Sequence, residues 1–197
     1  SDAMGGVVNI ITKNVTKEWT GSASVGFTAH DKSTFGNGHH GNFFVSGPLV
    51  QDKLGLQVYG GADYHPEDNI IGGSNRNKNR NINAKLSFTP TDKQTFILEG
   101  GRHLLEKQET PGKSLALTTT RGASVAHNQP GATHAIRNHW SLTHQADWDV
   151  ISSELSLYQE KAKREVSTNG VADSRKPEIT NTVFDAKFML PVANHFF

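Results

Sequence analysis

Residues 54–65 read Leu-Gly-Leu-Gln-Val-Tyr-Gly-Gly-Ala-Asp-Tyr-His and repeat with a period of two. Successive side chains of an extended segment point to opposite faces. Apolar and small residues therefore share one face, from Leu54 to Tyr64. The other face carries polar side chains such as Gln57 and His65. This stretch predicts a two-faced β-strand and sets the fold class.

The same alternation recurs along the chain, and helical periodicity is scarce. Segments that repeat it with varying clarity are residues 23–29, 43–45, 80–88, 96–100, 140–148, 155–165 and 184–190. Together they predict an all-β chain of about eight antiparallel strands from Trp19 onward.

The expected connections between these strands alternate in length. Short turns are expected at residues 48–53, 90–93 and 147–150, with a further turn at Pro191. Longer polar links are expected at residues 31–39, 66–79, 103–133 and 166–178. Tight turns on one side and long loops on the other are typical of a transmembrane β-barrel. Soluble antiparallel sheets also alternate apolar and polar residues, so a soluble extracellular β-protein such as an adhesin module remains the alternative.

Composition excludes several classes of function. The chain has 20 Lys plus Arg against 19 Asp plus Glu, so no charge excess indicates nucleic acid as a partner. The absence of cysteine excludes disulfides, thiolate zinc sites and cysteine nucleophiles. No apolar run approaches the ~18 residues of a transmembrane helix. The mean hydropathy of −0.53 does not argue against a barrel, whose strands need only every second residue to be apolar.

Three stretches carry a resemblance to a known family. Residues 1–13, Ser-Asp-Ala-Met-Gly-Gly-Val-Val-Asn-Ile-Ile-Thr-Lys, closely resemble the segment that ends the plug domain of TonB-dependent outer-membrane receptors. Residues 45–49, followed by residues 54–60, look like the second and third barrel strands around the first periplasmic turn. Residues 175–182 and the strand through Leu190 are similar to the ferric-siderophore subfamily that includes the ferric-enterobactin and colicin I receptors.

This resemblance implies antiparallel strands of a transmembrane β-barrel, about eight of the roughly 22 in a plugged receptor. Residues 1–14 would be the C-terminal end of the plug domain, with its last strand, and residues 15–197 the N-terminal part of the barrel. The chain has no energy-coupling box and almost no plug, so we expect it to be part of a longer receptor.

The resemblance also implies a location and a function. The expected location is the outer membrane of a Gram-negative bacterium, and the expected function is TonB-dependent uptake of ferric siderophores of the catecholate type. Expected partners are the ferric siderophore, the TonB energy-coupling protein, outer-membrane lipid, and a colicin or phage. Haem, cobalamin or a carbohydrate as the cargo of the same receptor fold remains open.

An anionic, aromatic ferric chelate calls for Arg and Lys side chains on the outer loops. Several basic residues are expected in or beside the long links. The candidate ligand contacts are Arg76, Lys78, Arg80, Arg121, Lys163 and Arg164. Solvated surface charge is the competing interpretation of each of them.

The ten histidines do not predict a metal site. His39 and His40 are adjacent, and His134, His139 and His144 are five residues apart, so on strands their side chains alternate between faces. No nucleophile with a base, and no carboxylate pair with a catalytic arrangement, can be identified. We therefore expect no metal, no cofactor and no enzymatic activity.

Overall fold

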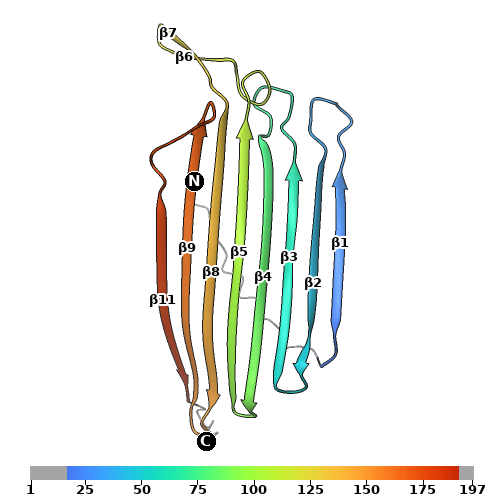
Figure 1. Cartoon of the computed structure of the whole chain (residues 1–197), viewed down its shortest axis with the longest axis vertical. Helices are drawn as coiled ribbons and strands as arrows, with labels where there is room; N and C mark the ends of the chain where they lie inside the picture. The colour runs from blue at the N-terminus through green and yellow to red at the C-terminus, as the bar shows by residue number, and fades with distance from the viewer. Residues whose placement is uncertain (1–16, 191–197) are drawn as a thin grey trace, which may run out of the picture.

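The computed structural model describes residues 17–190, and within that range every regular element is a β-strand (Figure 1). The long strands are β1 (Thr20–Thr28), β2 (Gly38–Val50), β3 (Leu54–His65), β4 (Arg76–Thr91), β5 (Gln94–Glu109), β8 (Gly131–Asp147), β9 (Ser152–Thr168) and β11 (Glu178–Met189). The short strands are β6 (Thr118–Arg121), β7 (Ser124–His127) and β10 (Val171–Ala172). The prediction of an all-β, antiparallel chain with about eight strands is confirmed. The predicted plug segment, residues 1–14, lies outside the described residues.

The long strands form one antiparallel sheet in which neighbours in sequence are neighbours in space. The order is β1-β2-β3-β4-β5-β8-β9, and β11 pairs with β9 at the far edge. Strands β6 and β7 form a separate two-stranded ribbon beyond the long-loop end of the sheet (Figure 1). No helix within residues 17–190 is long and apolar enough to cross a membrane.

The connections are sorted by length, as the sequence predicts. The turns at one end span residues 51–53, 92–93 and 148–151, whereas the links at the other end span residues 29–37, 66–75, 110–130 and 169–177. Two short turns place Asp52 and Asp149 at positive φ, 58° and 70°, a conformation that aspartate tolerates better than most residues. The Lys93 ammonium lies 2.5 Å from the Asp149 carboxylate and joins two neighbouring turns.

The strand register divides the sheet into two faces of opposite character. One row joins Leu56, Leu86, Leu98, Leu142, Leu157 and Phe184 across six strands. We call the face that carries this row the apolar face. The adjacent row joins Gln57, Lys85, Glu99, Ser141 and Tyr158 on the opposite side, which we call the polar face.

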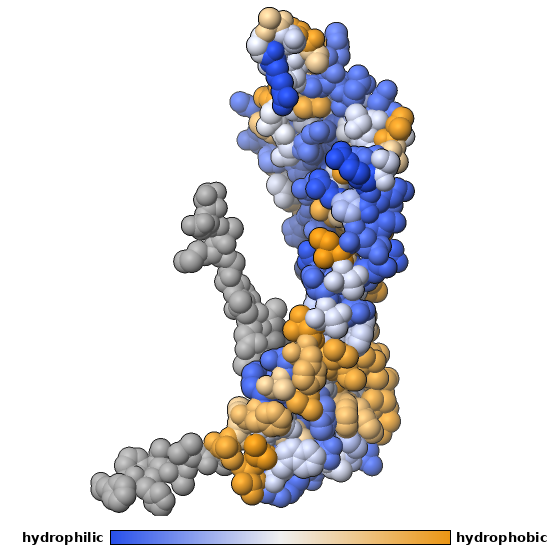
Figure 2. All heavy atoms as spheres, turned by 90° about the vertical axis from the view of Figure 1, so that its left-hand side faces the viewer, coloured by the Kyte–Doolittle hydropathy of each residue, from blue (hydrophilic) through white to orange (hydrophobic). Residues whose placement is uncertain are grey.

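The sheet covers neither face with a layer of its own. Among the described residues, Ala146 is the only buried hydrophobic residue, while Leu98 is 50% exposed and Phe184 is 68% exposed. The chain exposes 14260 Å², whereas a compact protein of its mass exposes about 9,000 Å². A soluble sandwich would bury one face against a second sheet. The apolar face therefore needs a non-aqueous environment, and apolar residues gather towards the short turns in Figure 2.

The upper limit of the apolar residues runs obliquely across the sheet. On β1 it reaches Phe27, which lies in the same row as Tyr64 and Lys78. On β9 it stops at Leu157, which is several rows closer to the short turns. The strands of a barrel are tilted and staggered in register. A flat membrane boundary therefore crosses a different row of paired residues on each successive strand. This stagger is what a section of a tilted transmembrane barrel requires.

Several strands extend further than predicted. Strand β4 begins at Arg76 and β5 ends at Glu109, so they take in parts of the predicted links 66–79 and 103–133. Arg76 and Lys78 therefore lie in a strand and not in a loop, which corrects the prediction, and Arg80 lies within the same strand. The polar residues of this stretch lack an apolar period, and cross-strand pairing with β3 and β5 fixes its conformation instead.

Candidate functional site

The candidate site lies on the polar face at the long-loop end. Strands β4, β5, β8 and β9 have 16 or 17 residues, more than the roughly 9–11 needed to cross a bilayer, so their ends project beyond it. Four basic side chains of this projecting region belong to the polar face: His103, Lys107, Arg137 and Arg164.

The side chains next to Arg164 in its row of paired residues are uncharged and apolar. It is directly opposite Ala135, which in turn is opposite Leu105. A hollow of about 370 Å³ opens here, and its lining includes His103, Leu105, Arg137, Arg164, Pro177 and Ile179. A second hollow of about 330 Å³ lies closer to the loops and is lined by Lys107, Thr133 and Arg164 among others. Arg164 is thus shared by the two hollows.

The charges of these basic residues are compensated to different degrees. The Arg137 Nε atom lies 3.7 Å from Glu160 Oε1, and the Tyr158 hydroxyl donates to Glu160 Oε2 at 2.7 Å. Arg164 is exposed and its guanidinium forms no salt bridge within residues 17–190. Its backbone N–H donates to the Pro177 carbonyl at 3.1 Å, which fixes the strand beneath the side chain. The guanidinium donors of Arg164 therefore remain available to an anionic ligand.

The structure brings the six predicted ligand contacts together only in pairs: Lys163 and Arg164 line one hollow, and Lys78 and Arg80 line another. Arg164 alone of the six belongs to the polar face. Arg76, Lys78, Arg80 and Lys163 are on the apolar-face side of their strands, beyond the apolar rows. Arg121 is on the β6–β7 ribbon, opposite Ser124. Their role as ligand contacts remains a prediction.

His103, Lys107 and Arg137 were not among the predicted contacts. A signal for them exists in the sequence, because Leu142 and Trp140 fix which positions of β8 face outward. Counting in steps of two from Leu142 and Trp140 places Arg137 on the other side of β8, the polar face. Applying the strand period beyond the apolar stretch would have identified these residues.

Two carboxylates of the β3–β4 loop hold three long loops together. Glu67 Oε1 accepts hydrogen bonds from the Thr110 backbone N–H at 2.5 Å and from the Ser114 hydroxyl at 2.7 Å. Asp68 accepts from the Gly36 N–H at 2.7 Å and from the Ser74 N–H at 2.8 Å. These bonds fix three long loops, two of which supply Asn75 and Gln129 to the lining of the second hollow, and we call Glu67 and Asp68 the loop clasp.

The hydrogen bonds of the loop clasp control its protonation. Burial by itself raises the pKa of Asp68, but the N–H groups of Gly36 and Ser74 outweigh it, and the pKa lies below its ordinary value of 3.8. Burial likewise raises the pKa of Glu67, and the donors of Ser114 and Thr110 reverse the effect, so this pKa lies below 4.5. The two carboxylates are therefore ionised at neutral pH.

The histidines do not converge. His39 pairs with Tyr64 on the apolar-face side, with ring centroids 5.1 Å apart, and the adjacent His40 is on the other side. Within residues 17–190, no group of three or more His, Cys, Asp or Glu side chains is arranged to hold a metal ion.

Comparison with known proteins shows which receptors the chain is similar to. No protein-family model matches the chain. The chain is 34% identical, over 99% of its length, to the iron-regulated outer membrane virulence protein of Vibrio cholerae serotype O1. It is 30% identical, over 92% of its length, to a probable TonB-dependent siderophore receptor, PirA, of Acinetobacter baumannii. The chain is homologous to one segment of the TonB-dependent outer-membrane receptors. This receptor segment spans 28% and 25% of the lengths of those two relatives.

Solved structures agree on the fold of the receptor segment. It superimposes on crystal structures of two mutants of the ferric enterobactin receptor PfeA of Pseudomonas aeruginosa with TM-scores of 0.63 and 0.64. Each match has 22% sequence identity and covers 89% of this chain and 28% of the other. The prediction of antiparallel barrel strands is confirmed, as is the outer-membrane location, because the relatives are outer-membrane receptors of Gram-negative bacteria. These relatives are named as an outer membrane virulence protein and as siderophore receptors.

Proposed function

We propose that the chain forms part of the barrel of an outer-membrane receptor that takes up ferric siderophores of the catecholate type and has no enzymatic activity. The names of the relatives support iron-siderophore uptake as the function. The proposed partners are the ferric siderophore, the TonB protein that supplies energy, the surrounding lipid, and a colicin or phage at the loops.

The observation that carries this proposal is the uncompensated Arg164 between two hollows on the polar face. A barrel interior is polar and its outer surface is apolar, so the polar face lines the lumen. A ferric catecholate is anionic, and a guanidinium is suited to its oxygen atoms. Arg164 therefore lies where a chelate entering between the long loops would pass.

The cargo is tested by binding to the full-length receptor that carries this chain, purified in detergent. Tryptophan quenching is measured with ferric enterobactin, a ferric hydroxamate and haem. Selective, saturable quenching by ferric enterobactin is the expected result. Quenching by haem or the hydroxamate alone, or by none of the three, would contradict the catecholate assignment.

The site is tested with Arg164→Ala in the same receptor. We expect ferric enterobactin to bind about tenfold to a hundredfold more weakly, because a hydrogen bond to a charged group contributes about 1.5–3 kcal/mol. Arg102→Ala is the matched control, since Arg102 is an exposed arginine on the apolar-face side of β5. Equal loss of affinity in the two variants would remove Arg164 from the proposed site.

A further inference from the structure

The β1–β2 loop is joined to the β3–β4 loop around Asp68. The Asn69 N–H donates to the Thr34 carbonyl at 2.7 Å, and the Gly36 N–H donates to Asp68 Oδ1 at 2.7 Å. A Cβ atom on Gly36 would lie 2.6 Å from the Pro66 carbonyl oxygen, so a residue with a side chain would not fit here without a backbone shift. We call this close contact between the two loops the loop junction.

Asp68 is the charged group at the centre of the loop junction. It is 3% exposed, and its carboxylate also accepts from the Ser74 N–H at 2.8 Å. The Nε2 atom of His65, the last residue of β3, lies 3.8 Å from Asp68 Oδ1. Burial raises the pKa of Asp68, whereas the N–H groups of Gly36 and Ser74 and the charges of His65 and His30 lower it. Two imidazoles therefore stabilise this carboxylate when they carry a positive charge.

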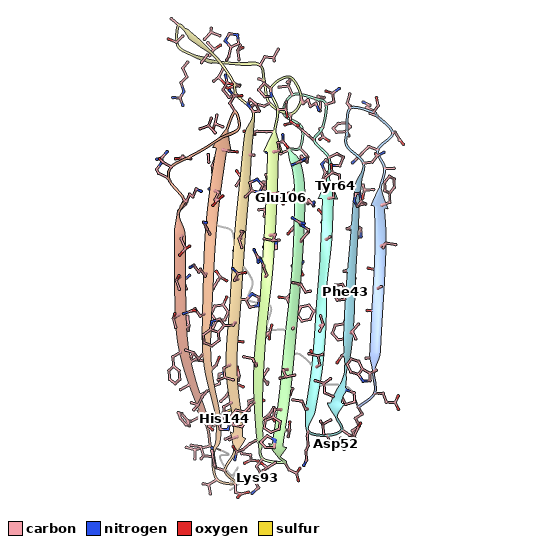
Figure 3. The ribbon with its side chains drawn as sticks, viewed as in Figure 1. Phe43, Asp52, Tyr64, Lys93, Glu106 and His144 are labelled. Carbon is pink, nitrogen blue, oxygen red and sulfur yellow. The ribbon has the colours of Figure 1, made fainter. Side chains whose placement is uncertain are left out.

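His65 lies beside a second polar group that has no partner. It is directly opposite Asn77 on the polar face, and Figure 3 shows the preceding residue, Tyr64, near the long-loop end of β3. His65 Nδ1 and Asn77 Oδ1 are both buried, and neither has a hydrogen-bond partner among the described residues. When the proton of a neutral imidazole is on the Nε2 atom that faces Asp68, Nδ1 is an acceptor beside another acceptor. The imidazolium has two N–H groups, one for Asp68 and one for Asn77.

Among the titratable and charged groups around His65, Asp68 alone forms an ion pair with it within residues 17–190. Lys107 of β5 lies in the same polar-face row, two strands away. Asp63 lies opposite His40, one row closer to the short turns. The other groups on the neighbouring elements are His30, Glu67 and Glu109. The charge of the His65 imidazole therefore acts mainly on the loop junction.

We propose that His65 and His30 make the loop junction sensitive to pH, so that protonation of these histidines between pH 8 and pH 5 attaches the β1–β2 loop more tightly to the β3–β4 loop. Histidine is the side chain that ordinarily changes its charge in this range. The charged form attracts the Asp68 carboxylate, so the stabilisation is present at the acid end and is lost as the pH rises. This device depends on the geometry of the loops and not on the cargo of the receptor.

The test is hydrogen exchange in the full-length receptor in detergent, at the two ends of the histidine range, pH 5 and pH 8, with correction for the intrinsic rate. The Gly36 N–H, which is bound to Asp68, should be about fivefold more protected at the lower pH, as expected for one ion pair. The Thr110 N–H is the internal control, because it is bound to Glu67 and should be equally protected at the two pH values.

The variant combines His65→Gln and His30→Gln, which remove the titrating groups. Its Gly36 N–H should show no pH dependence, while protection of Thr110 shows that the loops are folded. His127→Gln is the matched control, since His127 is an exposed histidine on the β6–β7 ribbon, and it should respond as the unaltered receptor does. Equal Gly36 protection at the two pH values in the unaltered receptor, a pH dependence that survives in the double variant, or an equal response of Thr110 would overturn the proposal.

Discussion

Glu67 shows how a single side chain organises the outer loops. It lies in the β3–β4 loop, yet its four hydrogen bonds reach Thr110 and Ser114, more than forty residues later in the chain. An ionised carboxylate is suited to this position because it only accepts hydrogen bonds. Protonation would turn one oxygen into a donor that faces other donors. The arrangement of the two loops that contribute Asn75 and Gln129 to the second hollow therefore depends on the charge of one group.

The loop clasp predicts a pH dependence of loop order. The pKa values of Glu67 and Asp68 are lowered in the folded state, so their contribution is complete above the ordinary values of 4.5 and 3.8 and is lost as the pH falls through the lower, folded values. In the full-length receptor, hydrogen exchange should show a protected Thr110 N–H at pH 7 and at pH 5, and loss of protection only as the pH falls below the ordinary value of 4.5 and through the lowered pKa of Glu67, after correction for the intrinsic exchange rate.

The variant Glu67→Gln should lose this protection already at pH 7, by about tenfold or more, because a bond to a charged acceptor contributes about 1.5–3 kcal/mol. Asp31→Asn is the control, since Asp31 is an exposed carboxylate in the neighbouring β1–β2 loop. Protection of Thr110 that is unaffected by Glu67→Gln would show that the clasp does not hold the loop.

At the scale of the strand, adjacent residues of β4 lie in different environments, one facing the lipid and the next facing the barrel lumen. Leu86 points to the apolar face in a row of leucines, and Ser87 points to the polar face beside Ile97 and Gly55. A lysine on the lipid-facing side costs about 2–4 kcal/mol at the middle of the bilayer, whereas lumen positions tolerate polar residues. The same substitution at adjacent positions should therefore have very different effects.

We predict that Leu86→Lys lowers the free energy of unfolding of the full-length receptor by about 2–4 kcal/mol, and that Ser87→Lys lowers it by less than about 1 kcal/mol. Reversible unfolding in denaturant with lipid vesicles measures the difference. Equal effects at the two positions would mean that β4 does not face lipid on the Leu86 side.

The strands also show where sequence reasoning succeeds. Residues 54–65 alternate without interruption, and β3 has these bounds, because lipid on one side and polar surroundings on the other impose the period of two. Above the membrane neither face has to be apolar, and the segment from Arg76 to Asn79 carries no apolar period, although basic residues and asparagines alternate in it. Its pairing with β3 and β5 is a long-range property, so residues 76–79 were predicted as part of a loop and the side on which Lys78 lies was missed.

At the scale of the whole molecule, the sheet has two open edges. Within residues 17–190, β1 pairs only with β2, and β11 pairs only with β9. Each edge presents a row of N–H and C=O groups, and an unsatisfied group in hydrocarbon costs several kcal/mol. The apolar face is exposed as well. The described sheet is therefore stable only where further strands close it into a barrel.

The 197-residue chain alone should therefore not behave as a monomer. After refolding into detergent, we expect size-exclusion chromatography with light scattering to show oligomers or aggregates, because the open edges of β1 and β11 pair between molecules. The full-length receptor under the same conditions should give a monomer, since closure of a barrel removes its edges. A strand-rich, protease-resistant monomer of the short chain would show that the sheet satisfies its edges by itself, and that neighbouring strands of the receptor are not needed to stabilise it.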